Sequence, residues 1–361
     1  MTSAAVSGAA PVRDEDAFDV AAAAAWLREN ASGTEGLESE PEVTQFVGGA
    51  SNLTYLLRYG SGRELVLRRP PSGTKARGAH DMRREHDLQA ALAPSFPLVP
   101  RMVAYCGDDA VLGSPFYVME RLVGTILRTD VPSDLGLDRE GVSALCRNAV
   151  DTLVALHDVD LGSSGLGELD RGDGYVRRQV DGWTTRYRTA RTPDVGDLEA
   201  TMAWLAEHRP ADLPHVLVHN DFRFDNLVLA ADDPTRVVGV LDWELATVGD
   251  PLMDLGSALA YWVQADDDPA FLAIRLQPTH TAGMLTRAEV VERYLEARGL
   301  DATPERWRFY EVFGAFRLAG IAQQIYYRFH HGQTTNPAYG AFRDVVRFLD
   351  RRCTELIAAA P

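Results

Sequence analysis

The sequence predicts an α+β protein with two lobes, a small antiparallel sheet followed by a larger and mostly helical lobe. Short apolar runs rich in β-branched residues lie between turn residues from position 43 to 120, as expected for strands. From position 138 onward, apolar residues recur at helical spacing, and three short apolar runs between 216 and 241 interrupt them. We therefore expect a tail and helix over residues 1–42, a first lobe over 43–121, and a second lobe over 122–361.

The first lobe should contain five strands and one helix. The start of the chain, residues 1–13, is rich in Ala, Ser and Gly and is predicted to be disordered. An alanine-rich helix with Trp26 as its apolar anchor should follow at 16–30. The strands are expected at 43–46, 53–59, 64–69, 102–106 and 116–120, and the helix of this lobe at 79–92.

The second lobe should be built from helices with a few short strands among them. A Gly- and Asp-rich segment, residues 161–174, is predicted to be a loop. Asp, Pro and Gly residues separate the apolar runs of this lobe and mark its turns. The helices are expected at 141–157, 175–191, 198–208, 252–262, 287–298, 304–331 and 339–356, and the strands at 216–218, 227–229 and 237–241.

The charge and the cysteines exclude several classes of protein. The 361 residues carry a formal net charge of −16 and no basic stripe, so nucleic acid and anionic membranes are not expected partners. No apolar run approaches the roughly 18 residues of a membrane span, and the start lacks the pattern of a signal peptide. Three widely spaced cysteines fit a reducing compartment, so a cytoplasmic location is predicted. The oligomeric state is not indicated.

Two polar clusters beside the short strands at 216–241 carry the strongest chemical signal. His219, Asp221 and Asn226 form the pattern H-x-D-x-x-x-x-N, in which the Asp orients or deprotonates an attacking hydroxyl and the Asn holds a magnesium ion. Asp242 follows the next strand but one and is placed to complete a site of hard oxygen ligands for Mg²⁺. Arg223 is placed to neutralise the transferred phosphoryl group. Turn and cap residues are the alternative reading of these carboxylates, and His219 reads equally well as a structural histidine.

The segments HNDFRFDN and LDWELATVGDPLMDL resemble the aminoglycoside phosphotransferase-like kinases, which are related to choline kinases. Within that family the chain is most similar to the branch with the kinase-like domain of acyl-CoA dehydrogenase fusion proteins, over residues 43–331. The resemblance implies a two-lobed protein-kinase-like fold that uses ATP and Mg²⁺. It implies a catalytic role for Asp221 and Arg223 and metal binding by Asn226 and Asp242. It also implies that Asp254 accepts backbone N–H bonds from the catalytic loop.

Residues of the first lobe are expected to bind the nucleotide. Small residues at 48–52, including Ser51 and Asn52, let backbone N–H groups approach phosphates, although a plain hairpin turn is equally consistent. By resemblance, Arg68 stands where most kinases have a Lys, and Glu85 is its expected partner, with surface charges as the alternative. Backbone groups from Glu120 to Leu122 should bind the adenine at a hinge. Glu244 reads as a support for the metal or for its ligands.

We expect an ATP-dependent phosphotransferase that acts on a hydroxyl of a small molecule. No Asp-Phe-Gly or Ala-Pro-Glu element follows the catalytic cluster, which argues against protein substrates. The arginine-rich helix at 175–191, with Gln323 and Arg328 of the aromatic helix at 304–331, suits a hydroxyacyl-CoA or a hydroxy acid. The alternatives are an aminoglycoside or other antibiotic O-phosphotransferase and a catalytically weak kinase-like binding protein.

Overall fold

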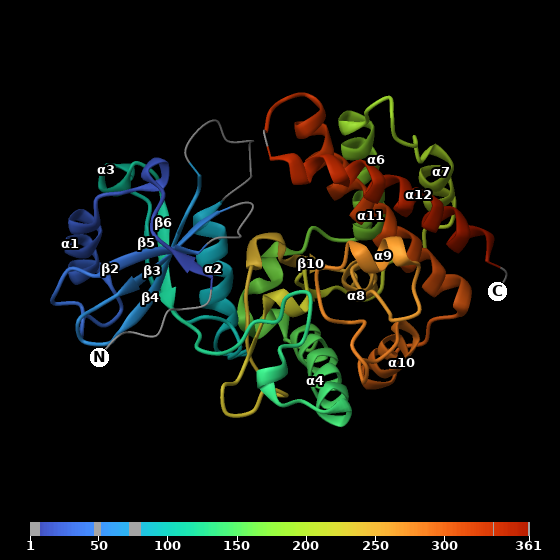
Figure 1. The fold of residues 1–361 in the computed structure, drawn as a ribbon. Helices are drawn as coiled ribbons and strands as arrows, with labels where there is room; N and C mark the ends of the chain where they lie inside the picture. The colour runs from blue at the N-terminus through green and yellow to red at the C-terminus, as the bar shows by residue number, and fades with distance from the viewer. Residues whose placement is uncertain (1–7, 47–51, 72–80, 335, 360–361) are drawn as a thin grey trace. The chain divides into compact units, whose positions relative to one another are not determined.

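The computed structural model describes residues 8–46, 52–71, 81–334 and 336–359. The chain forms two compact units, Met1–Val123 with Gly239–Glu244, and Gly124–Val238 with Leu245–Pro361. The segment 239–244 thus belongs to the first unit, although residues on both sides of it belong to the second. The first unit holds an antiparallel sheet and the second is mostly helical (Figure 1), so the expected α+β class is confirmed.

A six-stranded antiparallel sheet makes up most of the first unit, in the order β1-β2-β3-β4-β6-β5. Successive residues of a strand point to opposite faces. Leu67 of β4 therefore packs with Leu27 of α1, whereas its neighbour Val66 packs with Met82 of α2. The elements are β1 (Ala9–Ala10), α1 (Val20–Asn30), β2 (Glu42–Phe46), β3 (Leu53–Arg58), β4 (Glu64–Arg69), α2 (Met82–Leu92), β5 (Met102–Cys106), α3 (Asp109–Leu112) and β6 (Phe116–Glu120).

The five strands expected between positions 43 and 120 are confirmed to within one residue at each end. The predicted start of the first helix is wrong, because the carboxylate of Asp19 caps α1 by accepting from the N–H of Ala22 at 2.9 Å. The acidic residues Asp14–Asp16 form a separate 3₁₀ turn. The predicted disorder is also wrong for residues 8–13, since β1 pairs with the end of β2.

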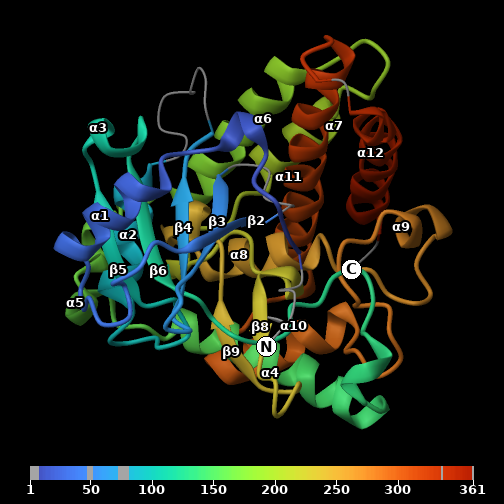
Figure 2. The ribbon, with the colours of Figure 1, turned by 60° about the vertical axis from the view of Figure 1, so that its left-hand side comes forward.

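Helices build the second unit around α11 (Pro304–His330), which packs against α6, α8 and α12 (Figures 1 and 2). The expected helices are confirmed, with ends that differ by up to three residues. The others are α4 (Arg139–His157), α5 (Leu161–Ser164), α6 (Tyr175–Ala190), α7 (Glu199–Glu207), α8 (Pro251–Leu259), α9 (Pro269–Ala273), α10 (Arg287–Arg298) and α12 (Phe342–Ala358).

Two glycines bring α8 and α11 into direct backbone contact. A Cβ on Gly256 of α8 would lie 2.5 Å from the carbonyl oxygen of Tyr310 in α11. A Cβ on Gly314 of α11 would lie 2.1 Å from the carbonyl oxygen of Gly256. Both distances are too short for any side chain, so only glycine at both positions permits this spacing. The two glycines therefore fix the spacing of α8, which carries Asp254, and α11, which carries Arg317.

Four strands interrupt the helical part of the chain: β7 (Val216–Val218), β8 (Leu227–Leu229), β9 (Val237–Val240) and β10 (Thr247–Gly249). The first three were expected, whereas β10 was not, because its three residues show no apolar alternation. It pairs antiparallel with β7, so that Val248 lies opposite Leu217. The predicted loop at 161–174 is wrong in part, since it contains α5 and the short 3₁₀ helix Leu166–Leu169.

Two findings bear on the environment of the protein. Among the described residues, none of the helices combines the length and the apolar character that crossing a bilayer requires. Cys106, Cys146 and Cys353 are buried free thiols. Burial raises the pKa of each of these thiols above its ordinary value, so they are inert packing residues.

Candidate active site

The polar segment 219–226 directly follows β7, and a buried carboxylate fixes its first two residues. Asp254 of α8 accepts hydrogen bonds from the backbone N–H groups of His219 and Asn220, both at 2.7 Å. The N–H of Asp221 donates in turn to Nδ1 of His219 at 3.2 Å. The expected bonds between Asp254 and this loop are therefore confirmed, and the contacts of His219 are those of a structural histidine.

A second buried pair supports Asp254 from behind. Nε2 of His157 in α4 lies 3.1 Å from the Asp254 carboxylate, and its Nδ1 lies 2.6 Å from the hydroxyl of Tyr294 in α10. Burial alone would raise the pKa of Asp254, but the bonds with His157 and His219 hold that pKa below its usual value. Asp254 therefore remains ionised in the interior and can bind both N–H groups of the loop strongly.

Asn220 stands in the left-handed region of the backbone, with φ +64°. Asn tolerates this conformation better than most residues because its short amide bonds locally. Its side chain donates to the carbonyl of Leu245 at 3.1 Å, and its own carbonyl accepts from Nη2 of Arg317 in α11 at 2.7 Å. Its N–H donates to Asp254, so Asn220 is held at its backbone nitrogen, its backbone oxygen and its side chain.

The carboxylate of Asp221 is paired with Arg223. Nε of Arg223 lies 3.2 Å from Oδ1 of Asp221, and its Nη2 lies 3.1 Å from Oδ2 of Asp225. The guanidinium also stacks on the ring of Tyr261, 4.5 Å from its centroid. Burial raises the pKa of Asp225. Arg223 thus already faces two carboxylates, and its contacts orient Asp221 more directly than they serve a phosphoryl group.

Asn226 ends the loop and is held by Asp221. Its Nδ2 donates to the backbone carbonyl of Asp221 at 2.8 Å and to Oδ2 of the same residue at 3.1 Å. Both bonds use the amide nitrogen, so the amide oxygen is left as a hard ligand of the type that Mg²⁺ prefers. The donor chemistry of Asn226 therefore fits the metal role expected from the sequence.

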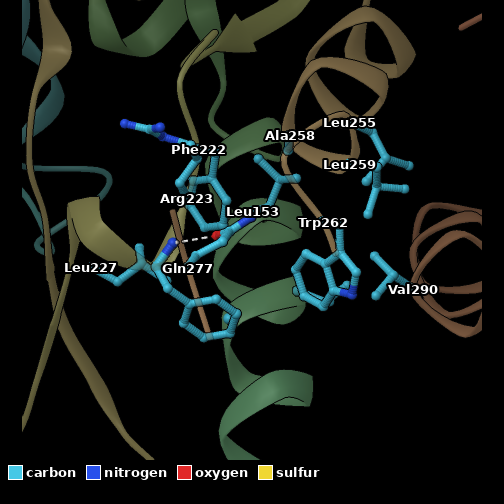
Figure 3. Close-up of a pocket in the computed structure, with 13 residues that line it drawn as sticks. Leu153, Phe222, Arg223, Leu227, Leu255, Ala258, Leu259, Trp262, Gln277 and Val290 are labelled. Atoms are coloured by element: carbon cyan, nitrogen blue, oxygen red, sulfur yellow. Dashed lines mark hydrogen bonds between the residues drawn. The ribbon is translucent and has the colours of Figure 1, made fainter. Parts of the chain in front are cut away.

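Apolar side chains pack behind the loop (Figure 3). Phe222 and Phe224 line a small cavity together with residues of α4 and α8. The guanidinium of Arg223 points away from Trp262 and Val290 (Figure 3). The N–H of Phe224 donates to Oε1 of the buried Gln277 at 3.1 Å. The cavity left among these residues measures about 30 Å³, room for little more than water-sized groups. The surrounding side chains support the loop, and the cavity is too small for a substrate.

The first unit holds a second polar cluster, centred on Arg68 of β4. Nη1 of Arg68 lies 3.4 Å from Oε2 of Glu85 in α2, so the expected pair is present. Tyr117 of β6 donates to Glu85 at 2.9 Å and accepts from Arg68 at 3.2 Å. Nδ2 of Asn52 donates to the other Glu85 oxygen at 2.9 Å. All four side chains are buried, so the cluster is rigid.

Asp242 joins this cluster through the segment that returns to the first unit. Its Oδ1 lies 3.3 Å from Nη2 of Arg68, and its backbone is left-handed, with φ +66°. Trp243, fully buried, and Glu244, whose carbonyl accepts from Arg84 at 3.0 Å, hold the segment beside α2. Burial alone would lower the pKa of Arg68, but the surrounding acidic groups raise it. Arg68 is thus a permanent cation beside the expected metal ligand.

The other residues expected to bind the nucleotide give less information. Ser51 lies outside the described residues, as do Gly48 and Gly49. The carboxylate of Glu120 pairs with Arg63 at 2.8 Å and with Arg101 at 2.7 Å. Its side chain is therefore engaged. Two backbone groups are engaged as well, since the N–H of Glu120 donates to the carbonyl of Arg101 at 2.9 Å and that of Arg121 to the carbonyl of Glu64 at 3.4 Å. The adenine bonds expected from Glu120 to Leu122 stay a prediction.

The arginines of α6 are mostly engaged elsewhere than at a binding surface. Arg178 donates to the loop carbonyls of Gly172 and Asp173, and Arg188 pairs with Glu199. Gln323 of α11 is fully buried and donates to the carbonyl of Ala190 at 2.8 Å. The prediction that Gln323 and these arginines line the substrate site is therefore not supported by their contacts.

The model of the phosphotransferase enzyme family, which carries the abbreviation APH, matches residues 42–310. The chain belongs to this family. Acyl-CoA dehydrogenase family member 10 of Mus musculus is 37% identical over 296 residues, which are 82% of this chain and 27% of that protein. The chain spans less than half the length of the curated relatives it matches.

Solved structures agree with this assignment to the phosphotransferase family. A protein of Ralstonia eutropha JMP134, provisionally described as an aminoglycoside phosphotransferase, is 30% identical with a TM-score of 0.77, over 94% of this chain and 98% of that one. A thermostable mutant of aminoglycoside phosphotransferase APH(4)-Ia, crystallised with AMP-PNP and hygromycin B, shares the fold at 17% identity with a TM-score of 0.55, over 94% and 99% of the two chains. The kinase-like fold expected from the sequence is therefore confirmed.

Several contact residues of this site were not expected from the sequence. Tyr117 and Tyr261 lie in apolar runs, where an aromatic residue reads as core. Asp225 lies inside the motif and reads as a turn residue. Arg317 carried the clearest signal that was missed, because it is a lone cation within the apolar stretch FGAFRLAG of α11. A single charge on a buried helix face needs a partner, and this requirement marks such a residue for attention.

Proposed function

We propose that the protein transfers the γ-phosphoryl group of ATP to a hydroxyl group of a small molecule. The observation that carries the proposal is the loop 219–226, in which Asp221 is held by Arg223 on one side and Asn226 on the other. A carboxylate fixed in this way can accept the proton of a hydroxyl while the hydroxyl oxygen attacks phosphorus. The bond from the γ-phosphorus to the bridging oxygen breaks, and ADP leaves.

We propose the remaining roles from the donor chemistry of each residue. Asn226 and Asp242 supply an amide and a carboxylate oxygen for Mg²⁺, which when bound neutralises charge on the phosphate oxygens. Arg68, fixed by Glu85, contacts the nucleotide phosphates, as a guanidinium can do with two parallel bonds. Asn52 fixes Glu85 in turn. Ser51 and the backbone from Glu120 to Leu122 complete the nucleotide site.

For Arg223 we propose an orienting role in catalysis. Its positive charge is shared between Asp221 and Asp225, and Tyr261 holds its plane. The guanidinium would keep the Asp221 carboxylate ionised and aimed at the acceptor hydroxyl. Direct contact with the transferred phosphoryl group would require it to leave at least one of these carboxylates, which costs energy in a half-buried site.

The proposed acceptor is a hydroxyacyl-CoA or a hydroxy acid. The similarity to acyl-CoA dehydrogenase family member 10 supports this class, since its name refers to acyl-CoA esters. An aminoglycoside is the second candidate, and the solved structures with that name support it. A binding protein without turnover is the third. With its free cysteines the protein is proposed to act in the cytoplasm.

The experiment is a turnover assay that measures ADP release with Mg-ATP and two acceptor sets, 4-hydroxyacyl-CoA esters and kanamycin-type aminoglycosides. Asp221→Asn is the control for phosphorylation by this site. Phosphorylation of the esters by the wild type alone would support the proposal. Efficient phosphorylation of the antibiotics with none of the esters would assign the second candidate. Nucleotide binding without turnover on any acceptor would favour the binding protein.

A further inference from the structure

Arg317 of α11 is an unusual cation in the second unit. The residue is only 5% exposed, and its one hydrogen bond among the described residues runs from Nη2 to the carbonyl of Asn220 at 2.7 Å. Within the part of the chain that the structure describes, no carboxylate lies within ion-pair distance of its guanidinium. A buried charge without a counter-ion is costly, so this arginine is expected to have an anionic partner that the chain itself does not provide.

Two other buried arginines show how the protein normally satisfies such a group. Arg68 is 8% exposed and faces the carboxylates of Glu85 and Asp242. Arg69 is 5% exposed and has no carboxylate, but it donates to three backbone carbonyls and to the hydroxyl of Tyr55. Arg317 matches neither pattern. It is as buried as Arg69, yet most of its five donors have no acceptor among the described residues.

The surroundings of Arg317 resemble one wall of a binding site. Its guanidinium carbon lies 5.3 Å from the ring of Trp183 in α6, and that of Arg186 lies 4.8 Å from the same ring. Trp183 is half-buried and Arg186 is exposed, so solvent reaches this side of α6. Gly320 of α11 admits the indole, because a Cβ there would lie 3.0 Å from it. A ring with two cations beside it offers both apolar surface and positive charge.

This wall lies close to Asp221, the proposed base. The carbonyl that Arg317 binds belongs to Asn220, and the next residue is Asp221. A ligand group bound by the free donors of Arg317 therefore lies within the length of a small molecule from the Asp221 carboxylate. A positive charge this close to the base would select acceptors that carry a negative charge apart from the reacting hydroxyl.

We infer that Arg317, with Trp183 beside it, binds an anionic group of the hydroxyl acceptor, a carboxylate or a phosphate. Both groups accept the parallel hydrogen bonds that a guanidinium offers. The inference rests on the proposed phosphotransfer at Asp221 and adds a residue that determines which acceptor is used. It also gives Arg317 a second function besides holding the carbonyl of Asn220.

The test compares three acceptors that share the same hydroxyl-bearing chain: 4-hydroxybutanoate, which carries a carboxylate, 4-hydroxybutanoyl-CoA, which carries phosphates beyond its pantetheine arm, and neutral 4-hydroxybutanamide. Arg317→Gln should raise KM roughly 10–100-fold for the anionic acceptor that the wild type prefers, the range expected for a lost charged hydrogen bond. KM for the amide should change less than about twofold. Arg317→Lys should restore part of the difference, because it keeps the charge without the paired donors.

A matched control is available on the same helix. Arg306 of α11 also donates to a backbone carbonyl, that of Ala211 at 3.1 Å. Arg306→Gln should leave the preference among the three acceptors unchanged. If Arg317→Gln instead lowers kcat equally for all three acceptors, Arg317 only holds the loop, and the inference is overturned. An increase in KM for ATP alone would overturn it as well.

A binding measurement separates this inference from the proposed function. Titration of the wild type with 4-hydroxybutanoate and with inorganic phosphate, followed by tryptophan fluorescence, needs no turnover. A saturable change that Trp183→Phe and Arg317→Gln both abolish would support the anion site even if none of the acceptors is phosphorylated. If the wild type turns over an acceptor but shows the same anion response as Arg317→Gln, the proposed function stands and the anion site is rejected.

Discussion

The two polar clusters of the protein are built in different ways. Around Arg68 in the first unit, side chains bind side chains, and positive and negative groups balance each other in a buried cluster. Around Asp221 in the second unit, side chains from two helices and one connecting segment bind the backbone of one loop. Asp254 takes two N–H groups, Arg317 takes a carbonyl, and Gln277 takes a further N–H.

This difference indicates how each cluster should respond to substitution. A change in the first cluster removes a charge or a hydroxyl from a network whose other members remain in place, so its effect should be confined to nucleotide and metal binding. A change in the supports of the second cluster alters the shape of the loop and therefore the position of the base. Four substitutions, two in each cluster, test this contrast.

The largest effect should follow from Asp242→Ala in the first cluster. The substitution removes the only charged ligand proposed for Mg²⁺ and leaves the cation of Arg68 with Glu85 alone. Turnover should fall by roughly 10³-fold or more, since a catalytic metal contributes several kcal/mol. Steady-state kinetics and calorimetry with Mg-ATP measure the two losses. Unchanged affinity for Mg-ATP together with an unchanged rate would make Asp242 a structural turn residue.

Asp221→Asn should lower kcat by roughly 10²–10⁴-fold, the usual contribution of a general base. The amide cannot accept the proton of the acceptor hydroxyl, while the backbone bonds of the loop remain. Affinity for Mg-ATP, measured by calorimetry, should therefore be retained. Near-normal turnover in this variant would exclude Asp221 as the base and would remove the asymmetry between the two clusters.

Asp254→Asn should destabilise the second unit by roughly 3–5 kcal/mol at neutral pH, because it leaves a buried hydrogen-bonded network without its charge. The pKa of Asp254 is lowered in the folded protein, so its stabilisation is fully present above the unfolded value near pH 4 and is lost as the pH falls toward the folded value. The difference in the free energy of unfolding between wild type and variant should therefore shrink below about pH 4. Urea denaturation at several pH values measures it.

A control variant makes that measurement specific to Asp254. The control is Asp250→Asn on the same helix, because burial raises the pKa of Asp250 instead of lowering it. Its effect on stability should follow the opposite trend with pH. If the two variants lose stability in parallel over the whole acid range, the ionised carboxylate of Asp254 does not hold the loop in the way described.

Tyr117→Phe should have the smallest effect. It removes one hydroxyl that bonds Glu85 and Arg68, while the direct pair between those two residues remains. The expected loss is about 1 kcal/mol, which corresponds to a several-fold rise in KM for ATP. Affinity for the acceptor should not change. A fall in kcat with an unchanged KM for ATP would show that the first cluster influences the chemical step.

The contrast between the clusters also explains what the sequence could predict. Strands and helices followed from apolar periodicity, and the pair of Arg68 and Glu85 followed from residue types that the family resemblance placed together. Supports of the loop through backbone groups give the sequence no partner residue to search for. Gln277 was therefore not recognised, and the lone charge of Arg317 in an apolar stretch indicated a buried contact without showing which one. Asp254 was expected only because the family has a counterpart. The hydroxyl of Tyr117 was hidden because an aromatic residue in a strand reads as core.

Predictions of local details were wrong where several residues of one type could fill the same role. Four acidic residues lie between positions 14 and 19, and periodicity does not distinguish the one that caps α1. The arginines of α6 were counted as one surface, although a helix distributes them around its axis. Arg178 and Arg188 bind loop carbonyls and Glu199, whereas Arg186 lies beside Trp183. The strand β10 is recognisable only from its pairing with β7.

The contact between Gly256 and Gly314 has a consequence for how far from the site a change can act. Asp254 lies half a turn from Gly256 on α8, and Arg317 lies just under one turn from Gly314 on α11. These two side chains hold the nitrogen and the oxygen of the same residue, Asn220. The spacing of the two helices therefore determines the backbone geometry of the residue next to Asp221, the proposed base. If Asp221 is the base, substitutions at Gly256 and Gly314 should affect turnover as well as folding.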